Sequence, residues 1–280
     1  MSELKGKTVL VTGATAGIGL ETALGIAKLG AHLVIVGRNA QKTKRVCDEL
    51  KATSGNQQLE FLLADLSLLS GVRTLAEEFL GRTSKLHVLI NNVGAINLKR
   101  EVTAEGLELT FAMNHLGPFL LTKLLLPALE KAAPSRIVNV SSDAHRSVGL
   151  DFDDLQSERS YSSFGAYARS KLMNILFTRE LARRVASKRI TANALHPGMV
   201  ASDFINKPGA FGKVANAFVS VFGISPEKGA RTSIFLAASP EVEGLTGRYF
   251  TKSKAVLPSR RAQDDEAAKR LWELSESLTR

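Results

Sequence analysis

Tyr167 and Lys171 have the residue types and the spacing for acid–base chemistry. They lie in a segment with helical periodicity, where residues four apart share one face about one turn from each other. A phenol has a pKa near ~10 and is protonated at neutral pH, whereas a nearby ammonium favours the phenolate and lowers that pKa. The pair therefore predicts an acid or base for a carbonyl or an alcohol. The alternative interpretation is a buried tyrosine beside a solvated lysine.

The elements that must position this pair alternate along the whole chain. Short apolar, β-branched runs are separated by longer helical segments, one of which is a long helix over 114–131. This alternation predicts an α/β fold, a doubly wound parallel sheet of about seven strands with helices on both faces, in a single domain over 1–280. Ligands bind beyond the carboxyl ends of such strands. The expected strands are 8–12, 32–36, 59–63, 88–90, 137–140, 191–195 and 247–250.

A glycine-rich turn follows the first strand. Glycines let the backbone approach a pyrophosphate, whose charge is stabilised at the amino end of a helix. The spacing is G-x-x-x-G-x-G rather than G-x-G-x-x-G, and a turn that only packs the helix on the strand is the alternative. Its position between strand and helix favours dinucleotide binding, by the residues Gly13, Thr15, Ala16, Gly17, Ile18 and Gly19.

The residues after the second strand indicate which dinucleotide binds. An NAD site usually has an Asp or Glu here for the ribose hydroxyl, whereas this chain has Gly37 and Arg38. A guanidinium binds a phosphate bidentately, so NADP(H) is expected rather than NAD(H), unless Arg38 is only a solvated side chain. After the third strand, Asp65 beside Leu66 either accepts from the adenine amino group or caps the next helix.

Polar residues follow the next strands as well. Asn92 braces the backbone and Gly94 allows close approach to a cofactor, although a plain turn is the alternative. Asn114 opens or interrupts a helix, where it holds a buried water or serves as a cap. After the fifth strand, a hydroxyl of Ser141 or Ser142 can donate to a substrate carbonyl. His196 is expected to be structural because the following proline fixes an extended backbone.

Together these residues resemble the short-chain dehydrogenase/reductase family over essentially the whole chain. The phrases 138–145, 196–200 and 271–275 are most similar to its retinol-dehydrogenase-like branch. Two departures are Val93, where the family more often has Ala, and Ser202, where many members have Thr. The apolar N-terminal anchor of the membrane-bound relatives is also missing from this sequence.

The resemblance implies a role for each site residue. Tyr167 would be the general acid in reduction and the general base in oxidation. Lys171 would lower its pKa and bind the nicotinamide ribose, Ser142 would orient the carbonyl, and Asn114 would hold a water that relays protons to Lys171. The hydride comes from the cofactor. The resemblance also implies cofactor contacts from Asp65, Leu66, Asn92, Gly94, Tyr167, Lys171, Pro197, Gly198 and Val200.

Two further segments are predicted near the end of the chain. Residues 199–225 contain many apolar side chains and are expected to form a substrate lid with an apolar inner face, which favours a lipophilic aldehyde or ketone. An ordinary core helix is the alternative. Residues 264–278 are expected to form a closing amphipathic helix.

Composition narrows the remaining possibilities. The single Cys47 rules out an internal disulfide and a multi-cysteine metal site, and no metal is expected. The net charge is +10, but no basic block stands out, so nucleic acid is not an expected partner. The sequence shows no signal peptide and no apolar run judged long enough to span a bilayer, which favours a cytoplasmic protein. A homo-oligomer and a monomer both remain open.

The sequence therefore predicts an NADP(H)-dependent oxidoreductase that acts on a small-molecule carbonyl or alcohol. The alternative is a catalytically silent NADP(H)-binding sensor or scaffold on the same fold, since fold alone does not decide function.

Overall fold

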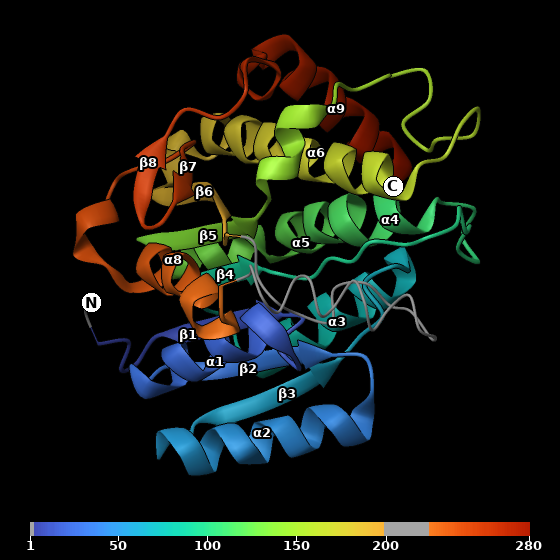
Figure 1. The fold of residues 1–280 in the computed structure, drawn as a ribbon. Coiled ribbons are helices and arrows are strands. Elements are labelled where there is room, and N and C mark those ends of the chain that lie inside the picture. Colours follow the sequence, from blue (N-terminus) through green and yellow to red (C-terminus); the bar gives the residue numbers. More distant parts are fainter. Residues whose placement is uncertain (1–2, 199–223) are drawn as a thin grey trace.

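A computed structural model describes residues 3–198 and 224–280 of the chain. The described residues form an eight-stranded sheet in the order β3-β2-β1-β4-β5-β6-β7-β8 (Figure 1). All neighbouring strands are parallel except β7 and β8, which are antiparallel. The strands are β1 (Thr8–Thr12), β2 (His32–Gly37), β3 (Leu59–Leu63), β4 (Val88–Asn91), β5 (Ser135–Val140), β6 (Ile190–His196), β7 (Tyr249–Thr251) and β8 (Lys254–Val256).

Helices cover both faces of this sheet because its strands are apolar on both sides. In β1, Val9 and Val11 pack on one side and Leu10 packs on the other, and all three are fully buried. The side of Val9 is covered by α1 (Gly17–Lys28), α2 (Ala40–Ser54) and α8 (Pro226–Ala238). The side of Leu10 is covered by α3 (Leu69–Arg82), α5 (Gly117–Lys131) and α6 (Ser163–Arg184). The predicted α/β sheet with helices on both faces is confirmed.

The edge of the sheet differs from the sequence prediction by one strand. β8 was not foreseen, because its three residues are all exposed and carry no apolar pattern. It pairs with β7 through a turn in which Lys252 and Ser253 have positive φ angles. A strand this short is held by its hairpin rather than by burial of its side chains.

The long helix predicted over 114–131 begins earlier and is interrupted. It consists of α4 (Leu109–Phe111), a π-helical turn η1 (Ala112–Leu116) and α5. By length and hydropathy, Leu109–Lys131 is apolar enough to cross a membrane, which corrects the expectation that no such run exists. The window is 72% buried inside the protein, as in a core helix of a folded domain.

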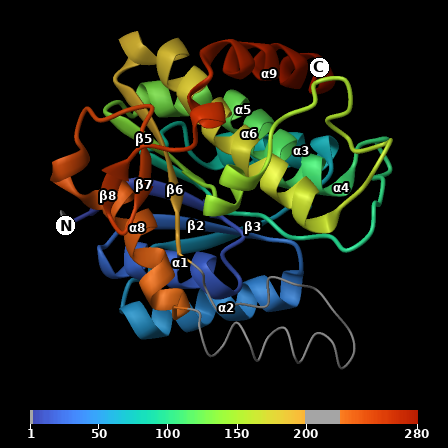
Figure 2. The ribbon, with the colours of Figure 1, turned by 45° about the horizontal axis from the view of Figure 1, so that its top comes forward.

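The last helix, α9 (Asp265–Leu278), lies along α6 on the outside of the molecule (Figures 1 and 2). It falls in the range where a closing helix is predicted, and the Asp264 side chain accepts from the backbone N–H of Ala267 at 2.9 Å at its start. Trp272 packs edge-on against Phe119 of α5 and stacks on Phe177 of α6. The C-terminal helix therefore shares the core of the sheet.

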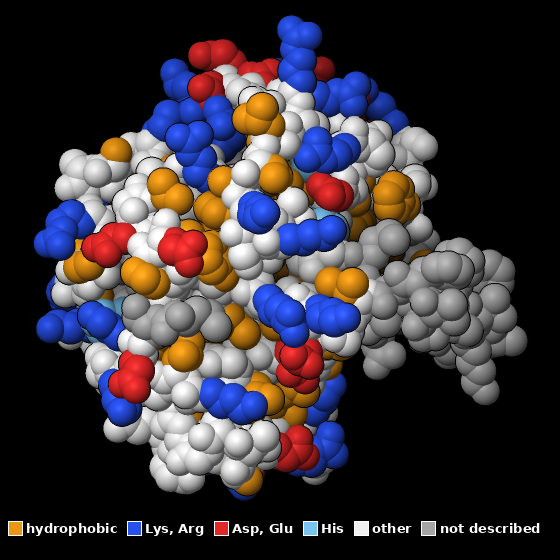
Figure 3. Space-filling model, turned by 60° about the vertical axis from the view of Figure 1, so that its left-hand side comes forward, with side chains coloured by type: hydrophobic (Ala, Val, Ile, Leu, Met, Phe, Trp, Pro, Cys, Tyr) orange, Lys and Arg blue, Asp and Glu red, His pale blue; other side chains and the backbone are white. Residues whose placement is uncertain are grey.

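The surface charge is distributed rather than gathered on the face drawn in Figure 3. Lys and Arg side chains are spread over this face with Asp and Glu side chains between them. Hydrophobic side chains are scattered among the charged ones.

Candidate functional site

The turn after β1 has a geometry that requires glycine. Gly13 and Gly17 have φ angles of +64° and +53°, in the left-handed region that disfavours side chains. A Cβ on Gly19 would overlap the carbonyl oxygen of Gly13 and the side-chain amide of Asn92. A ligand can therefore approach the backbone of this turn closely only because these positions are glycines.

Asn92 braces this turn against the end of β4. Its side-chain nitrogen donates to the carbonyl oxygens of Thr12 at 3.0 Å and Gly13 at 3.2 Å. In return the Thr12 hydroxyl accepts from the backbone N–H groups of Asn92 and Val93, at 3.0 and 3.2 Å. Four hydrogen bonds thus join the carboxyl ends of β1 and β4, and Thr12, for which the sequence predicted no role, accepts three of them.

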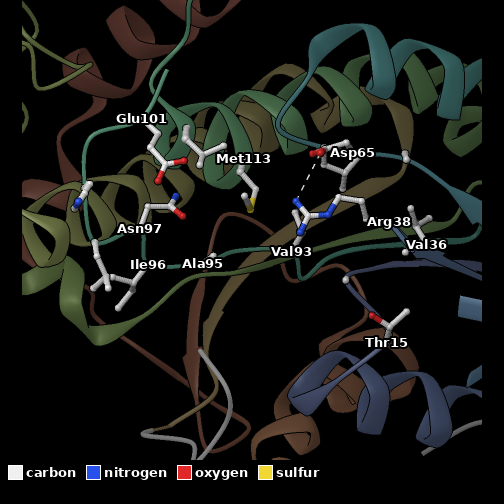
Figure 4. Close-up of a pocket in the computed structure, with 17 residues that line it drawn as sticks. Thr15, Val36, Arg38, Asp65, Val93, Ala95, Ile96, Asn97, Glu101 and Met113 are labelled. Carbon is white, nitrogen blue, oxygen red and sulfur yellow. Dashed lines mark ion pairs between the residues drawn. The ribbon is translucent and has the colours of Figure 1, made fainter. Parts of the chain in front are cut away.

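A cavity of about 540 Å³ opens beside the turn (Figure 4). Arg38 and Asp65 face each other in it, with 3.6 Å between the guanidinium and the carboxylate. The Arg38 side chain is 69% exposed, so its guanidinium remains accessible to a ligand. Five of the predicted cofactor residues line this cavity: Gly13, Thr15, Arg38, Asp65 and Leu66.

Asp65 does not cap the next helix, which was its alternative interpretation: Leu68 is at the cap position of α3, and the N–H of Ser70 donates to Glu105 at 2.9 Å. The other carboxylate oxygen of Asp65 accepts from the backbone N–H and the hydroxyl of Ser67, at 3.0 and 2.6 Å. One oxygen therefore shapes the turn before α3, and the other faces Arg38.

Gly94 connects the cavity to the predicted catalytic residues. Its neighbours Val93 and Ala95 line the cavity, and a Cβ on Gly94 would lie 3.0 Å from the Nζ of Lys171. Lys171 extends from α6, is 2% exposed, and donates to the carbonyl oxygen of Val140 at 2.9 Å. Its Nζ lies 5.5 Å from the ring centre of Tyr167. Tyrosine and lysine thus lie on one buried face of α6, as their spacing predicts.

Burial sets the proton affinities of both residues. It lowers the pKa of Lys171 from 10.5 to about 8, because an ammonium loses its hydration. It raises the pKa of Tyr167 to about 12, with a hydrogen bond from Ser142 acting in the opposite direction. This direction is opposite to the lowering that the sequence led us to expect. Tyr167 is therefore protonated at neutral pH in this structure, in the form that donates a proton.

Ser142 follows β5 and begins the 3-10 helix η2 (Asp143–Ser147). Its hydroxyl accepts from the backbone N–H of Ala144 at 3.2 Å and forms a hydrogen bond with Tyr167. The cap fixes the serine backbone at the carboxyl end of the central strand. The chain thereby brings Ser142, Tyr167 and Lys171 to one place.

Asn114 lies in the π-helical turn and is fully buried. Its side-chain oxygen accepts from the N–H of Ala95 at 3.0 Å, and its nitrogen donates to the Ala95 carbonyl and the Ser170 hydroxyl, both at 3.0 Å. The side chain therefore ties the strand-four loop to α6. That it also holds a water stays a prediction.

The remaining predicted residues are only partly described. Pro197 and Gly198 follow β6, and Gly198 has a φ of +101°. Val200 lies outside the described residues, as does most of the predicted lid, residues 199–223. Ser225 at the end of that segment caps α8 by accepting from the N–H of Lys228 at 3.3 Å.

A polar cluster behind Ser142 was missed by sequence reasoning. Asp143 accepts from the Tyr249 hydroxyl at 3.1 Å and from Arg146 at 3.1 Å, and lies 3.6 Å from the Nε2 of His196. Burial, supported by the neighbouring Asp143 carboxylate, raises the pKa of Tyr249 above its usual range. No local signal predicts this cluster, because Tyr249 is 106 residues from Asp143.

Comparisons with known proteins agree with this geometry. Residues 7–210 match the family model of the short chain dehydrogenases. The chain is 42% identical to retinol dehydrogenase 14 of Homo sapiens, over 98% of this chain and 87% of that protein. It is also 42% identical to retinol dehydrogenase 12 of Mus musculus, over 98% and 86%.

Solved structures show the same fold. An uncharacterised protein from Mycobacterium paratuberculosis has a TM-score of 0.81 and 32% identity, with 100% of this chain and 95% of the other covered. A putative NAD(P)-dependent gluconate 5-dehydrogenase from Beutenbergia cavernae, with bound NADP at low occupancy, has a TM-score of 0.72 and 27% identity, covering 89% and 96%.

Proposed function

Because this chain belongs to the short-chain dehydrogenase family, we propose that it is an NADP(H)-dependent oxidoreductase that interconverts a lipophilic aldehyde or ketone and its alcohol. The observation that carries the proposal is the meeting of Ser142, Tyr167 and Lys171 beside Gly94, at the edge of the Arg38 cavity. A sensor or scaffold that only binds the dinucleotide has no need of these three groups together.

The cavity and the glycine turn fit a dinucleotide phosphate. Glycine at positions 13, 17 and 19 leaves the amino end of α1 open to a pyrophosphate. Arg38 presents an accessible guanidinium where a ribose 2′-phosphate would need one, and a Cβ on Gly37 would overlap the hydroxyl of Thr43. The NADP bound to the Beutenbergia relative lends support to the same cofactor class.

When bound, the nicotinamide supplies or accepts the hydride. The protein's own part is to hold the carbonyl and move a proton. Ser142 donates a hydrogen bond to the carbonyl oxygen, and Tyr167, protonated because burial raises its pKa to about 12, gives its phenolic proton to that oxygen. The buried Lys171 ammonium stabilises the phenolate that remains. In the alcohol-oxidising direction the same phenolate takes the proton back.

A lipophilic substrate is supported by the cavity wall. The part of the wall beyond Gly94 includes Ile96, Leu98, Leu109 and Met113. Apolar walls favour apolar ligands because binding removes both surfaces from water. The relatives named as retinol dehydrogenases act on a lipophilic alcohol by their names, and this supports the same class here.

Tyr167→Phe tests the catalytic role. We expect kcat to fall by a factor on the order of 10² to 10⁴, the range typical of losing a general acid, with the Kd for NADPH nearly unchanged. Tyr161→Phe is the comparison variant: its hydroxyl donates to the Asn97 carbonyl at 2.8 Å in the cavity wall, so its removal should change KM rather than kcat. NADPH consumption is measured against aliphatic, aromatic and retinal-like carbonyls. Tight NADPH binding without turnover in the wild type would favour the silent sensor instead.

Arg38→Asp tests the cofactor assignment. Because the variant replaces a phosphate-binding cation with a repelling anion, we expect NADPH affinity to fall on the order of tenfold or more while NADH affinity holds or improves. Arg45→Asp is the control, since Arg45 on α2 is also 69% exposed but does not line the cavity. An unchanged ratio of the two affinities in Arg38→Asp would refute the phosphate contact.

A further inference from the structure

His145 is fully buried and has a partner on each ring nitrogen. Its Nδ1 lies 2.7 Å from the carbonyl oxygen of Ser142, and its Nε2 lies 3.0 Å from the backbone nitrogen of Ser259. A backbone N–H can only donate, so Nε2 must present its lone pair. Nδ1 then carries the hydrogen and donates to Ser142, because a neutral imidazole has one donor and one acceptor. The two contacts together fix one neutral tautomer.

The histidine therefore joins two segments that are 114 residues apart in sequence. One is the turn that holds Ser142 at the end of β5, and the other is the chain just after β8. A second bond runs parallel to it, from the Arg146 guanidinium to the carbonyl oxygen of Leu257 at 3.0 Å. The ring of His145 also packs edge-on against Tyr249 of β7, with 5.1 Å between ring centres.

We propose that His145 is a positioning residue for Ser142, which it clamps to the segment 257–259 through its neutral Nδ1–H tautomer. The proposal rests on the function proposed above, in which the Ser142 hydroxyl orients the substrate carbonyl. A hydroxyl must be held within a fraction of an ångström to act on the carbonyl, and a shift of about 1 Å can cost a large factor in rate. A hydrogen bond to the backbone carbonyl of Ser142 fixes the backbone that carries this hydroxyl.

The surroundings keep the histidine neutral. Asp143 and Arg146 face it from η2, His196 from β6 and Tyr249 from β7. Burial lowers the pKa of His145, and its bond to Ser142 and the Asp143 carboxylate oppose this only in part. A proton on Nε2 would direct an N–H at the N–H of Ser259 and break that end of the clamp.

His145→Phe removes both side-chain bonds, keeps a ring against Tyr249, and leaves the backbone N–H of residue 145 on the Ser142 carbonyl at 3.2 Å. We expect kcat for carbonyl reduction to fall on the order of tenfold, with the Kd for NADPH within about twofold of the wild type. His145→Asn restores a donor at the position of Nδ1 and is expected to recover most of the lost kcat.

His87→Phe is the matched control for a loss of stability alone. His87 also accepts a backbone N–H, that of Thr8 at 2.9 Å, but at the amino end of the sheet, far from the site. Its variant should unfold more easily while keeping its kcat. Equal kcat losses in His87→Phe and His145→Phe, or full activity in His145→Phe, would overturn the proposal.

The tautomer of His145 can be determined by a measurement that does not depend on enzyme activity. Imidazole nitrogen NMR of the wild type should show His145 with hydrogen on Nδ1 and a lone pair on Nε2. Hydrogen on Nε2 would overturn the clamp even in an active enzyme. If the protein reduces no carbonyl, the proposed function fails, and the NMR result still decides whether the clamp exists.

Discussion

At the scale of single residues, Lys171 carries the largest electrostatic cost in the candidate site. The residue is 2% exposed and its ammonium donates to a neutral carbonyl oxygen, and its pKa falls to about 8 because burial removes its hydration. A charged side chain placed this way destabilises the fold. This destabilising charge lies beside Tyr167, where the proposed reaction needs a positive charge.

This cost predicts a pH dependence of stability. Between pH 8 and 10.5 the unfolded chain holds a proton on Lys171 that the folded protein has released, so the free energy of unfolding rises with pH in this window. Below pH 8 both states are protonated and the penalty is constant. Relative to Lys171→Met, the wild type should gain roughly 2 kcal/mol between pH 8 and 10.

Urea unfolding of both proteins at several pH values checks this. Near pH 10 the unfolded chain begins to ionise the phenol of Tyr167, whose folded pKa is about 12, but both proteins contain Tyr167, so its contribution cancels in the comparison. Parallel curves for wild type and Lys171→Met would mean that the buried lysine does not lose its proton in this range.

At the scale of elements, the turn between β1 and α1 depends on what the end of β4 allows. Gly19 of α1 lies against both the Gly13 carbonyl and the Asn92 side chain. Because glycine has no Cβ, the three segments can pack this closely. The turn, the helix start and the strand end therefore form one unit. A substitution in any of the three should weaken the binding of the cofactor.

Gly19→Ala tests this unit. The added methyl group has no room against backbone, so we expect a loss of about 1–3 kcal/mol in stability and a weaker Kd for NADPH by on the order of tenfold. Gly25→Ala in the same helix is the control, because its methyl group would meet only the flexible end of Ile234. That variant should keep its NADPH affinity in a fluorescence titration. If both variants bind NADPH equally, the turn is not the binding unit.

The sequence predicts elements of this site better than it predicts their contacts. Tyr167 and Lys171 share a face because helical spacing is local, and the carboxyl-end rule for parallel sheets placed Ser142 and Gly94 at the right edge. The bond from Ser259 to His145 joins segments 114 residues apart, so no local pattern in the sequence predicts it. The raised pKa of Tyr167 could not be read from spacing either, because burial is set by the whole fold.

At the scale of the molecule, the period of the apolar residues was enough to predict the layers. Val9 and Leu10 are both apolar because both faces of the sheet are covered, and this signal is strong in every central strand. It fails at the edge, where β8 is three exposed residues. The apolar pattern also fails to predict the π-helical turn Ala112–Leu116, which contains Asn114. Such a turn leaves the spacing of apolar residues nearly unchanged.

The whole chain is expected to unfold as one unit, and its single tryptophan reports on this. Trp272 belongs to α9, yet it lies in the same core cluster as Leu10 of β1 and Leu62 of β3. Because these side chains share one core, α9 should not detach while the sheet is folded. Tryptophan fluorescence and far-UV circular dichroism should therefore give the same urea midpoint.

Two leucines of α9 provide the decisive comparison. Leu271 is 1% exposed in the core, so Leu271→Ala should cost about 2–5 kcal/mol and lower both midpoints by the same amount. Leu278 is 37% exposed at the end of the same helix, and Leu278→Ala should shift either midpoint only slightly. If Leu271→Ala lowered the fluorescence midpoint alone, α9 would be a separate unit docked on a sheet that folds without it. Since Trp272 contacts Phe119 and Phe177 from two helices that cover the sheet, we expect the two midpoints to move together.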